Sequence, residues 1–255
     1  MMIDLHSHLL ANVDDGSTSL QQSADVLALF LEHGVTDVVL TPHIRASQIA
    51  RSAEQQIERR DQALAALRSA APAGVQLHPG FEIMLDEPLP ETARGDRRFA
   101  LAGSRYYLVE FPLAIVGELA GGVLQKLAQV GIIPLVAHPE RYTQCSVEGV
   151  AGWRRAGTRV QVDATTLTRK TLRGRRARAL VAAGVADVLA ADNHGDRRTL
   201  KTAVEFLEAR DGGTALSLLT GENPQAVLRD EAMGDVPPIR LRERWMERMR
   251  RWIDP

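Results

Sequence analysis

The chain has 255 residues, of which 45% are hydrophobic and 25% charged, an ordinary globular composition with enough length to bury a large core. Its net charge of -1 gives no general attraction to nucleic acid, and its one cysteine excludes an internal disulfide framework. We find no run of 18 apolar residues and no charged-then-apolar signal pattern. We therefore expect a cytoplasmic protein without a transmembrane segment.

Apolar runs typical of strands alternate with helical patterns along most of the chain. The predicted strands cover residues 3–5, 35–40, 75–77, 81–83, 106–111, 132–137, 159–163 and 186–191. The predicted helices cover residues 19–33, 52–71, 117–130, 149–156, 171–183 and 198–208, followed by a pair at 212–219 and 224–228. Residues 220–223 are predicted to join that pair, with Asn223 as N-cap and Pro224 as the first helical residue.

This alternation predicts a parallel sheet flanked by helices. The count of about seven strand–helix units favours a single α/β barrel over an open doubly wound sheet. The sequence also lacks the Gly-x-Gly-x-x-Gly and Gly-Lys-Ser/Thr phosphate loops of nucleotide-binding open sheets. We therefore expect one barrel domain over residues 1–236.

A different kind of segment follows Pro237-Pro238. Residues 237–255 form a basic tail that is rich in arginine and carries the apolar side chains Trp245, Met246, Met249, Trp252 and Ile253. One interpretation is a C-terminal helix that packs this apolar stripe on the barrel. The other is a basic amphipathic segment that contacts an anionic membrane surface or a partner.

The most informative feature is a set of potential metal ligands that follow strand-like runs. They are His6, His8, Asp15, His43, Glu82, Glu110, His138, Asp192 and His194. Residues two apart at a strand end point to one face, so His6 pairs with His8, and Asp192 with His194. Ligands at the ends of many parallel strands meet at the mouth of a barrel, which predicts a polynuclear metal site.

The remaining candidates have structural explanations as well as functional ones. His33 precedes Gly34 at a helix C-terminus, where an imidazolium suits the dipole, while His78 beside Pro79-Gly80 is ambiguous. Asp14-Asp15-Gly16 is a turn signal by itself, but near His6 and His8 it is also a candidate ligand loop. Cys145 is not followed by a Cys-x5-Arg loop, so we interpret it as incidental.

Several of these pieces together resemble the PHP (polymerase and histidinol phosphatase) superfamily. They are Asp4-x-His6-x-His8, Thr41-Pro-His43, Gly80-Phe-Glu82, Glu110-Phe-Pro112, His138-Pro-Glu-Arg141-Tyr142 and Asp192-x-His194. Val13-Asp-Asp-Gly16 and the His138–Tyr142 run look like the bacterial manganese-dependent protein-tyrosine phosphatases of capsule and exopolysaccharide operons, the CpsB/YwqE type. The resemblance implies a distorted (β/α)7 TIM-like barrel, the PHP fold.

The resemblance also implies roles for individual residues. His6, His8, Glu82 and Asp192 would hold one metal ion; Glu82 would bridge to a second ion with Glu110 and His138; Asp15, His43 and His194 would hold a third. Arg141 would bind phosphate, and Arg197 or Arg198 would supply a second arginine. The implied ion is Mn²⁺, with Fe or Zn²⁺ as alternatives for such imidazole- and carboxylate-rich ligands. The sequence departs from many relatives at Ala191, Gly195 and Asp163.

The function implied by the resemblance is hydrolysis of phosphotyrosine in proteins by attack of a metal-bound hydroxide. The expected substrate is a bacterial tyrosine autokinase of capsule or exopolysaccharide synthesis. Two alternatives stay open: a small-molecule phosphatase such as one for histidinol phosphate, and a catalytically silent metal-binding docking module. A nuclease is disfavoured because the chain is nearly neutral and only 4% aromatic, so we expect no nucleic-acid partner.

Overall fold

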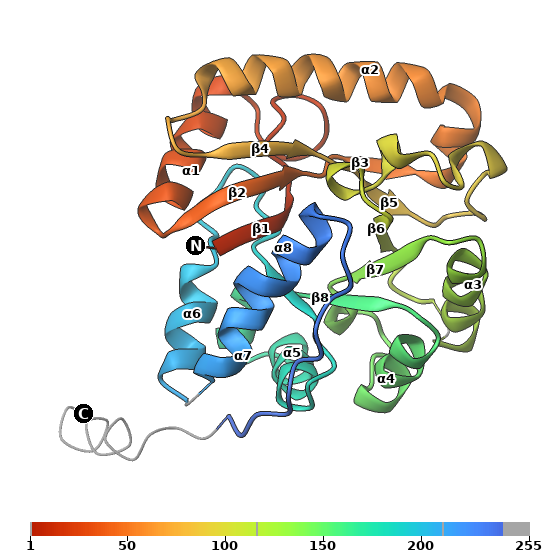
Figure 1. The fold of residues 1–255 in the computed structure, drawn as a ribbon, viewed down its shortest axis with the longest axis vertical. Coiled ribbons are helices and arrows are strands. Elements are labelled where there is room, and N and C mark those ends of the chain that lie inside the picture. Colours follow the sequence, from red (N-terminus) through yellow and green to blue (C-terminus); the bar gives the residue numbers. More distant parts are fainter. Residues whose placement is uncertain (1, 116, 211, 242–255) are drawn as a thin grey trace.

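A computed structural model describes residues 2–115, 117–210 and 212–241. Its strands form two sheets in which every pairing is parallel (Figure 1). The first has the order β1-β2-β4, with β1 at Met2–Ser7, β2 at Val35–Leu40 and β4 at Gln76–Pro79. The second has the order β3-β5-β6-β7-β8-β9, at His43–Arg45, Glu82–Met84, Tyr106–Glu110, Ile133–Ala137, Arg159–Asp163 and Val188–Ala190.

The chain passes from the first sheet into the second at two places, each a short gap between consecutive strands. β2 runs into β3 through Thr41-Pro42, where the proline has no N–H to donate to a ladder. β4 runs into β5 through Gly80, where an added Cβ would lie 2.9 Å from Val39 Cγ1. The predicted parallel α/β architecture is confirmed. The paired strands of the described residues form two open sheets, so closure into one barrel stays a prediction.

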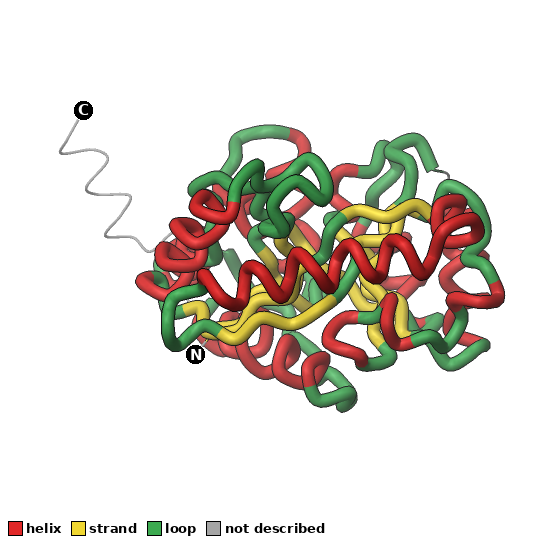
Figure 2. Tube along the Cα trace, turned by 90° about the horizontal axis from the view of Figure 1, so that it is seen from above, coloured by secondary structure: helices red, strands yellow, loops and turns green. Residues whose placement is uncertain are grey.

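Helices cover the sheets on the outside. They are α1 (Leu20–Glu32), α2 (Ala46–Ala70), α3 (Gly117–Gln129), α4 (Val147–Arg155), α5 (Leu172–Ala182), α6 (Lys201–Glu208), α7 (Gly213–Ser217) and α8 (Asn223–Leu228). The long helix α2 lies across β2 and β4 (Figures 1 and 2). It buries Ile57, Leu64 and Leu67, which lie on one face of the helix. This arrangement places an apolar stripe on the sheet and leaves the polar face in solvent.

Most predicted elements are confirmed, and their ends follow the expected local chemistry. Ser19 caps α1 by accepting a hydrogen bond from the Gln22 N–H, and Thr171 caps α5 by accepting one from Gly174. Gly34 follows α1 with a φ of 81°, a left-handed conformation that glycine adopts without steric cost. His33 is the C-cap of α1 and contacts Thr199 Oγ1 at 3.0 Å, so its structural interpretation is confirmed.

The start of α2 was predicted wrongly. The helix begins at Ala46 rather than at residue 52, because Ala46 and Ile49 are buried and hold an additional turn against the core. The predicted start coincides with a real interruption, since Ser52 has a non-helical φ of -150°. Its hydroxyl donates to the Gln48 carbonyl, a back-bond that bends helices.

The connection at residues 220–223 was also predicted wrongly. Residues Leu218–Glu222 form a π-helical turn, so the chain is helical from α7 into α8 and Asn223 is not an N-cap. The Asn223 amide instead donates to the carbonyls of Asp187 and Gly234 and accepts from the Gly234 N–H. These long-range hydrogen bonds satisfy the buried side chain and hold the following segment on the sheet.

That segment continues onto α5. Val236 is buried, and the Ile239 N–H donates to the Ala182 carbonyl at the end of α5. The apolar stripe predicted for the tail falls at residues 245–253, outside the described residues. Among the described residues, the helices are all too short or too polar to cross a membrane.

Candidate metal centre

The structure brings all of the predicted ligands together at the carboxyl ends of the strands. His6 lies in β1 and His8 just after it; His43 and Glu82 open β3 and β5, where β2 and β4 have ended. Glu110 ends β6, His138 follows β7, and Asp192 and His194 follow β9. Four sets have ligand atoms within 4.8 Å of one another: His8-Asp15-His43-His194, His6-His8-Asp192, His6-Glu82-His138 and His43-Glu82-Glu110.

Glu82 lies at the middle of this cluster and is fully buried. Its Oε1 is 2.9 Å from His138 Nε2. Its Oε2 is 3.1 Å from His6 Nε2, 3.3 Å from His8 Nε2 and 2.9 Å from His43 Nδ1. One carboxylate therefore reaches histidines from three different strand ends.

Asp192 faces Glu82 across the same space. Its Oδ1 lies 3.3 Å from His6 Nε2 and 3.4 Å from His8 Nε2. Glu82 Oε2 and Asp192 Oδ1 are buried without a partner in hydrogen-bond geometry. Buried carboxylate oxygens need a hydrogen bond or a cation, and imidazoles with carboxylates are the ligands of Mn, Fe and Zn. The donor set therefore fits divalent metal ions.

The outer side of the cluster is open to solvent. Asp15 has a 72% exposed side chain, with Oδ1 3.4 Å from His43 Nε2 and 3.7 Å from His194 Nε2. Glu110 Oε1 lies 3.6 Å from His43 Nδ1, and its Oε2 lies 4.0 Å from His138 Nε2. The grouping differs from the implied assignment in that Glu110 lies with His43 and Glu82 in one set, and His138 with His6 and Glu82 in another.

Partners behind the histidines orient them toward the cluster. Gln161 Oε1 accepts from the His138 N–H and lies 3.1 Å from His6 Nδ1, while Asp14 Oδ2 lies 2.6 Å from His8 Nδ1. These contacts engage Nδ1 of His6 and His8, so Nε2 of each ring faces Glu82 and Asp192, where a metal ion would bind. The sequence predicted a turn at Asp14 and a strand at residues 159–163 that contains Gln161, without these roles. Spacing cannot find them, because they contact their histidines from a different strand and from a loop.

Asp4 also supports the site and was missed as a functional residue. It is fully buried, accepts from the His6 and Ala191 N–H groups, and so joins β1 to the end of β9. Its alternation with His6 and His8 is the signal that could have found it. Burial raises the pKa of the Asp4 carboxyl to about 7, and the two N–H groups oppose this.

The backbone is specialised where the ligands are presented. His138 and Asp192 adopt positive φ values of 33° and 48°, a conformation that is costly for non-glycine residues and clusters at functional sites. Gly16 lets the Asp14–Asp15 loop approach β1, because a Cβ at this position would lie 1.9 Å from the His8 carbonyl oxygen. The Asp-Asp-Gly signal is therefore both a turn and a way to carry acidic side chains to the cluster.

The charges of the cluster balance one another. Burial acts to lower the pKa of His6, but Glu82 and Asp192 outweigh it and raise the pKa to about 9. Burial likewise opposes ionisation of Glu82 and Asp192, yet the surrounding histidines hold the pKa of both carboxyls well below the usual range. Burial and the nearby Glu82 raise the pKa of Glu110 to about 7. A cation bound here would displace protons from the histidines.

The predicted arginines differ in their position relative to the cluster. Arg141 Nη2 donates to Asp192 Oδ2 and, at 3.2 Å, to Asp163 Oδ2. Arg198 Nη1 lies 3.9 Å from Asp192 Oδ2, whereas Arg197 is exposed and lines a surface pocket beside α1. Arg141 and Arg198 are therefore near the cluster and Arg197 is not.

Two other candidates lie apart from the site. His78 on β4 contacts Asp37 Oδ1 on β2 at 3.0 Å, so it joins two strands away from the ligands. Cys145 is partly buried, and burial with the nearby Glu140 raises the pKa of its thiol to about 11. A thiol with so high a pKa is a poor nucleophile, in agreement with the interpretation of Cys145 as incidental.

Comparison with known proteins agrees with the resemblance seen in the sequence. Residues 2–229 match the family described as capsular polysaccharide synthesis, CpsB/CapC. The tyrosine-protein phosphatase YwqE of Bacillus subtilis is 26% identical over 262 residues, covering 95% of this chain and 98% of the relative. The putative tyrosine-protein phosphatase CapC of Staphylococcus aureus is 31% identical over 140 residues, 55% of this chain and 54% of the relative.

A solved structure extends this agreement to the fold. It comes from work on YwqE of Bacillus subtilis and CpsB of Streptococcus pneumoniae, described as unique metal-dependent tyrosine phosphatases. It matches with a TM-score of 0.76 and 25% identity, over 95% of this chain and 100% of that one. The chain therefore belongs to the CpsB/CapC family.

Proposed function

We propose that this member of the CpsB/CapC family is a metal-dependent phosphatase that hydrolyses phosphotyrosine in proteins. The observation that carries the proposal is the convergence of His6, His8, His138, Glu82 and Asp192, in which imidazole nitrogens approach two buried carboxylate oxygens without hydrogen-bond geometry. The names of its relatives support the phosphotyrosine substrate. The proposed physiological substrate is a tyrosine autokinase of capsule or exopolysaccharide synthesis.

The proposed cofactor is Mn²⁺, with up to three ions and with Fe or Zn²⁺ as alternatives. The proposed ligands are His6, His8, Asp15, His43, Glu82, Glu110, His138, Asp192 and His194. Divalent ions supply charge neutralisation for a phosphoryl group and make water more acidic. Gln161 and Asp14 orient His6 and His8 toward the ions.

A cavity beside the cluster supplies a place for the substrate. It has a volume of about 430 Å³ and is lined on one side by Asp15, His43 and Glu110. Val13 and Met84 add apolar atoms to the lining, which suit a tyrosine ring, and Arg45 adds a cation. We propose that Arg141 binds phosphoryl oxygens with its planar guanidinium and that Arg198, rather than Arg197, assists it.

We further propose that the two sheets act as one distorted seven-position barrel over residues 1–236. Counting β2 with β3 and β4 with β5 as interrupted strands leaves seven positions, and Ser7 meets Asn193 in a parallel bridge between the ends of β1 and β9. Residues 237–255 would form a tail that begins along α5 and either packs on the barrel or contacts an anionic membrane surface or a partner. The proposed location of the enzyme is the cytoplasm.

The competing functions predict different substrates for the same site chemistry. A small-molecule phosphatase would prefer an ester such as histidinol phosphate, and a silent docking module would turn over neither substrate. The names of the relatives, which are tyrosine-protein phosphatases, favour a catalytic centre over the silent module.

The test is the ratio of kcat/KM for a phosphotyrosine peptide to that for histidinol phosphate, measured on one metal-loaded sample. We expect the peptide to be preferred, and we expect EDTA to remove both activities and Mn²⁺ to restore them. The Arg197→Ala variant is the matched control, because its side chain lies away from the cluster. A preference for histidinol phosphate would overturn the phosphotyrosine assignment.

A further inference from the structure

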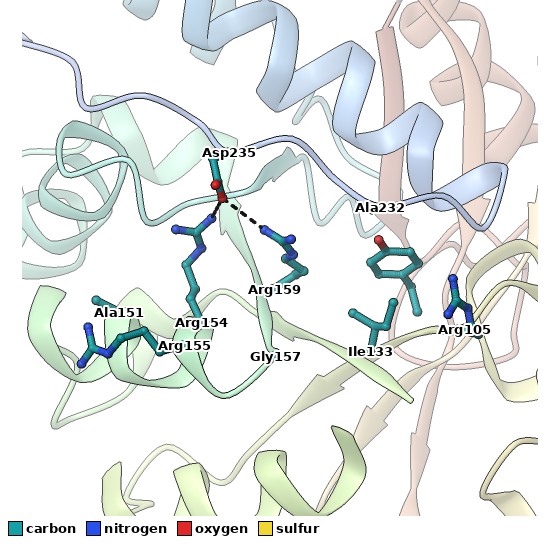
Figure 3. A pocket seen from close by; sticks show the side chains of 10 residues that line it. Arg105, Ile133, Ala151, Arg154, Arg155, Gly157, Arg159, Ala232 and Asp235 are labelled. Carbon is teal, nitrogen blue, oxygen red and sulfur yellow. Dashed lines mark hydrogen bonds and ion pairs between the residues drawn. The ribbon is translucent and has the colours of Figure 1, made fainter. Parts of the chain in front are cut away.

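A second cavity, whose lining residues are drawn in Figure 3, lies at the starts of strands whose other ends carry metal ligands. Its volume is about 540 Å³, and it surrounds the starts of β6, β7 and β8 at Arg105, Ile133 and Arg159. Glu110 of the metal cluster ends β6, so the strand separates the two sites by roughly 13 Å. The cavity is therefore distinct from the proposed active site.

Two arginines of this cavity are fixed by one buried carboxylate. Asp187 is fully buried and accepts from Arg154 Nε at 3.1 Å, from Arg154 Nη2 at 2.8 Å and from Arg159 Nη1 at 3.0 Å. It also accepts from the Val160 N–H. Asp187 therefore holds both guanidiniums in place, and the exposed Asp235 balances their second positive charge.

The carboxylate of Asp235 marks a position in the cavity where the anionic group of a ligand could bind instead. Asp235 has an 88% exposed side chain, and its Oδ1 lies 3.0 Å from Arg154 Nη2 and 3.7 Å from Arg159 Nη1 (Figure 3). An exposed ion pair of this kind contributes little free energy. A ligand oxyanion can therefore replace Asp235 between the same two guanidiniums.

The other cations of the cavity are incompletely neutralised. Arg105 shares Asp230 with Arg97, at 3.0 Å and 3.2 Å respectively. Arg155 is exposed and has no ion pair within the described part of the chain. Apolar atoms of Tyr106, Ile133, Ala151 and Ala232 form the rest of the wall.

We propose that this cavity binds a small organic phosphate, without hydrolysing it. The two guanidinium forks of Arg154 and Arg159, which meet at Asp235, suit the oxygens of a phosphate, and the apolar wall suits an organic body. The volume falls within the range of about 300–1,000 Å³ that is typical of small-molecule sites. Binding would displace Asp235, which lies on the segment that leads to α5 and the C-terminal tail.

The test uses ADP as the probe and measures its Kd for the full chain by calorimetry. Arg155→Ala removes an arginine without breaking an ion pair of the described residues and is expected to weaken binding about tenfold. Asp235→Asn removes the competing carboxylate and is expected to tighten binding about threefold. Arg51→Ala removes one exposed charge from α2 and serves as the matched control, with Kd unchanged.

A variant of the metal centre separates the two sites. The Kd for ADP that changes in Arg155→Ala and Asp235→Asn should be unchanged in the Arg141→Ala variant, whose substitution lies in the proposed active site. The proposal is overturned if Arg155→Ala and Arg51→Ala have the same effect, if Asp235→Asn weakens binding, or if ADP does not bind. Inorganic pyrophosphate should bind more weakly than ADP; equal affinities would remove the organic body from the proposal.

Discussion

The inner and outer sides of the metal cluster differ in burial and in support. On the inner side, His6, His8, Glu82 and Asp192 are at most 1% exposed, and Gln161 and Asp14 hold the two histidines. On the outer side, the side chains of Asp15 and His43 are 72% and 36% exposed. The comparison indicates a preorganised inner half that retains ions and an open outer half that can admit a phosphoryl group.

The largest effect is expected from Glu82→Gln on the inner side. The amide would leave His6, His8 and His138 facing a neutral group, so we expect kcat/KM to fall by more than about 100-fold with loss of bound metal. Activity and metal content on the same sample check this. His78→Ala is the control, because that histidine contacts Asp37 away from the cluster. Normal metal content in Glu82→Gln would contradict a ligand role for Glu82.

The arginines should separate substrate binding from metal binding. We expect kcat/KM to fall about 100-fold in Arg141→Ala, about tenfold in Arg198→Ala and not at all in Arg197→Ala, following their proximity to Asp192. Metal content should stay normal in all three. Equal losses in Arg197→Ala and Arg198→Ala would show that proximity to Asp192 does not identify the second arginine.

Neighbouring acidic residues allow the two halves to be compared directly. Asp14→Asn weakens the partner of His8, so we expect the affinity of the most tightly held ion to fall about tenfold. Asp15→Asn alters only the exposed half, and this ion should keep its affinity. A chelator titration of each variant measures the difference, and identical titration curves would show that the two halves are not distinct.

A smaller effect is expected on the pH dependence of the free energy of unfolding, through the buried carboxyl of Glu140. Burial and the nearby Asp163 raise the pKa of the Glu140 carboxyl from 4.5 to about 8. The folded state then holds more protons than the unfolded state in this window, so the free energy of unfolding falls as pH rises. The glutamine of Glu140→Gln stays neutral at every pH. Between pH 5 and about 8 the free energy of unfolding should therefore fall less in the variant than in the original protein, the two losses differing by a few kcal/mol. A constant difference in Tm between the two proteins across this range would exclude the shift.

Local patterns in the sequence predicted the ligand positions and the parallel α/β architecture. His6 with His8 and Asp192 with His194 obey the two-residue period of a strand end, and each follows an apolar run. Long-range contacts could not be predicted in this way. Asn223 lies in a helix while its side chain bonds Asp187 and Gly234, and Gln161 on β8 supports His6 on β1 although 155 residues separate them in the sequence.

The arginine cavity was hidden for the same reason. Arg105, Arg154 and Arg159 belong to different elements and meet only because β6, β7 and β8 are neighbours in the sheet. Arg198 could not be separated from Arg197 by sequence, because both follow the same motif. The structure separates them, since one points toward Asp192 and the other lines a pocket beside α1.

The most direct test of the central claim is to measure phosphotyrosine-peptide hydrolysis and metal content together on the purified chain, before and after EDTA and after Mn²⁺ is restored. We predict more than one metal ion per chain and an activity that is lost and regained with the metal. Hydrolysis that persists in fully metal-free protein would contradict the account, as would a metal-loaded protein that leaves the peptide intact.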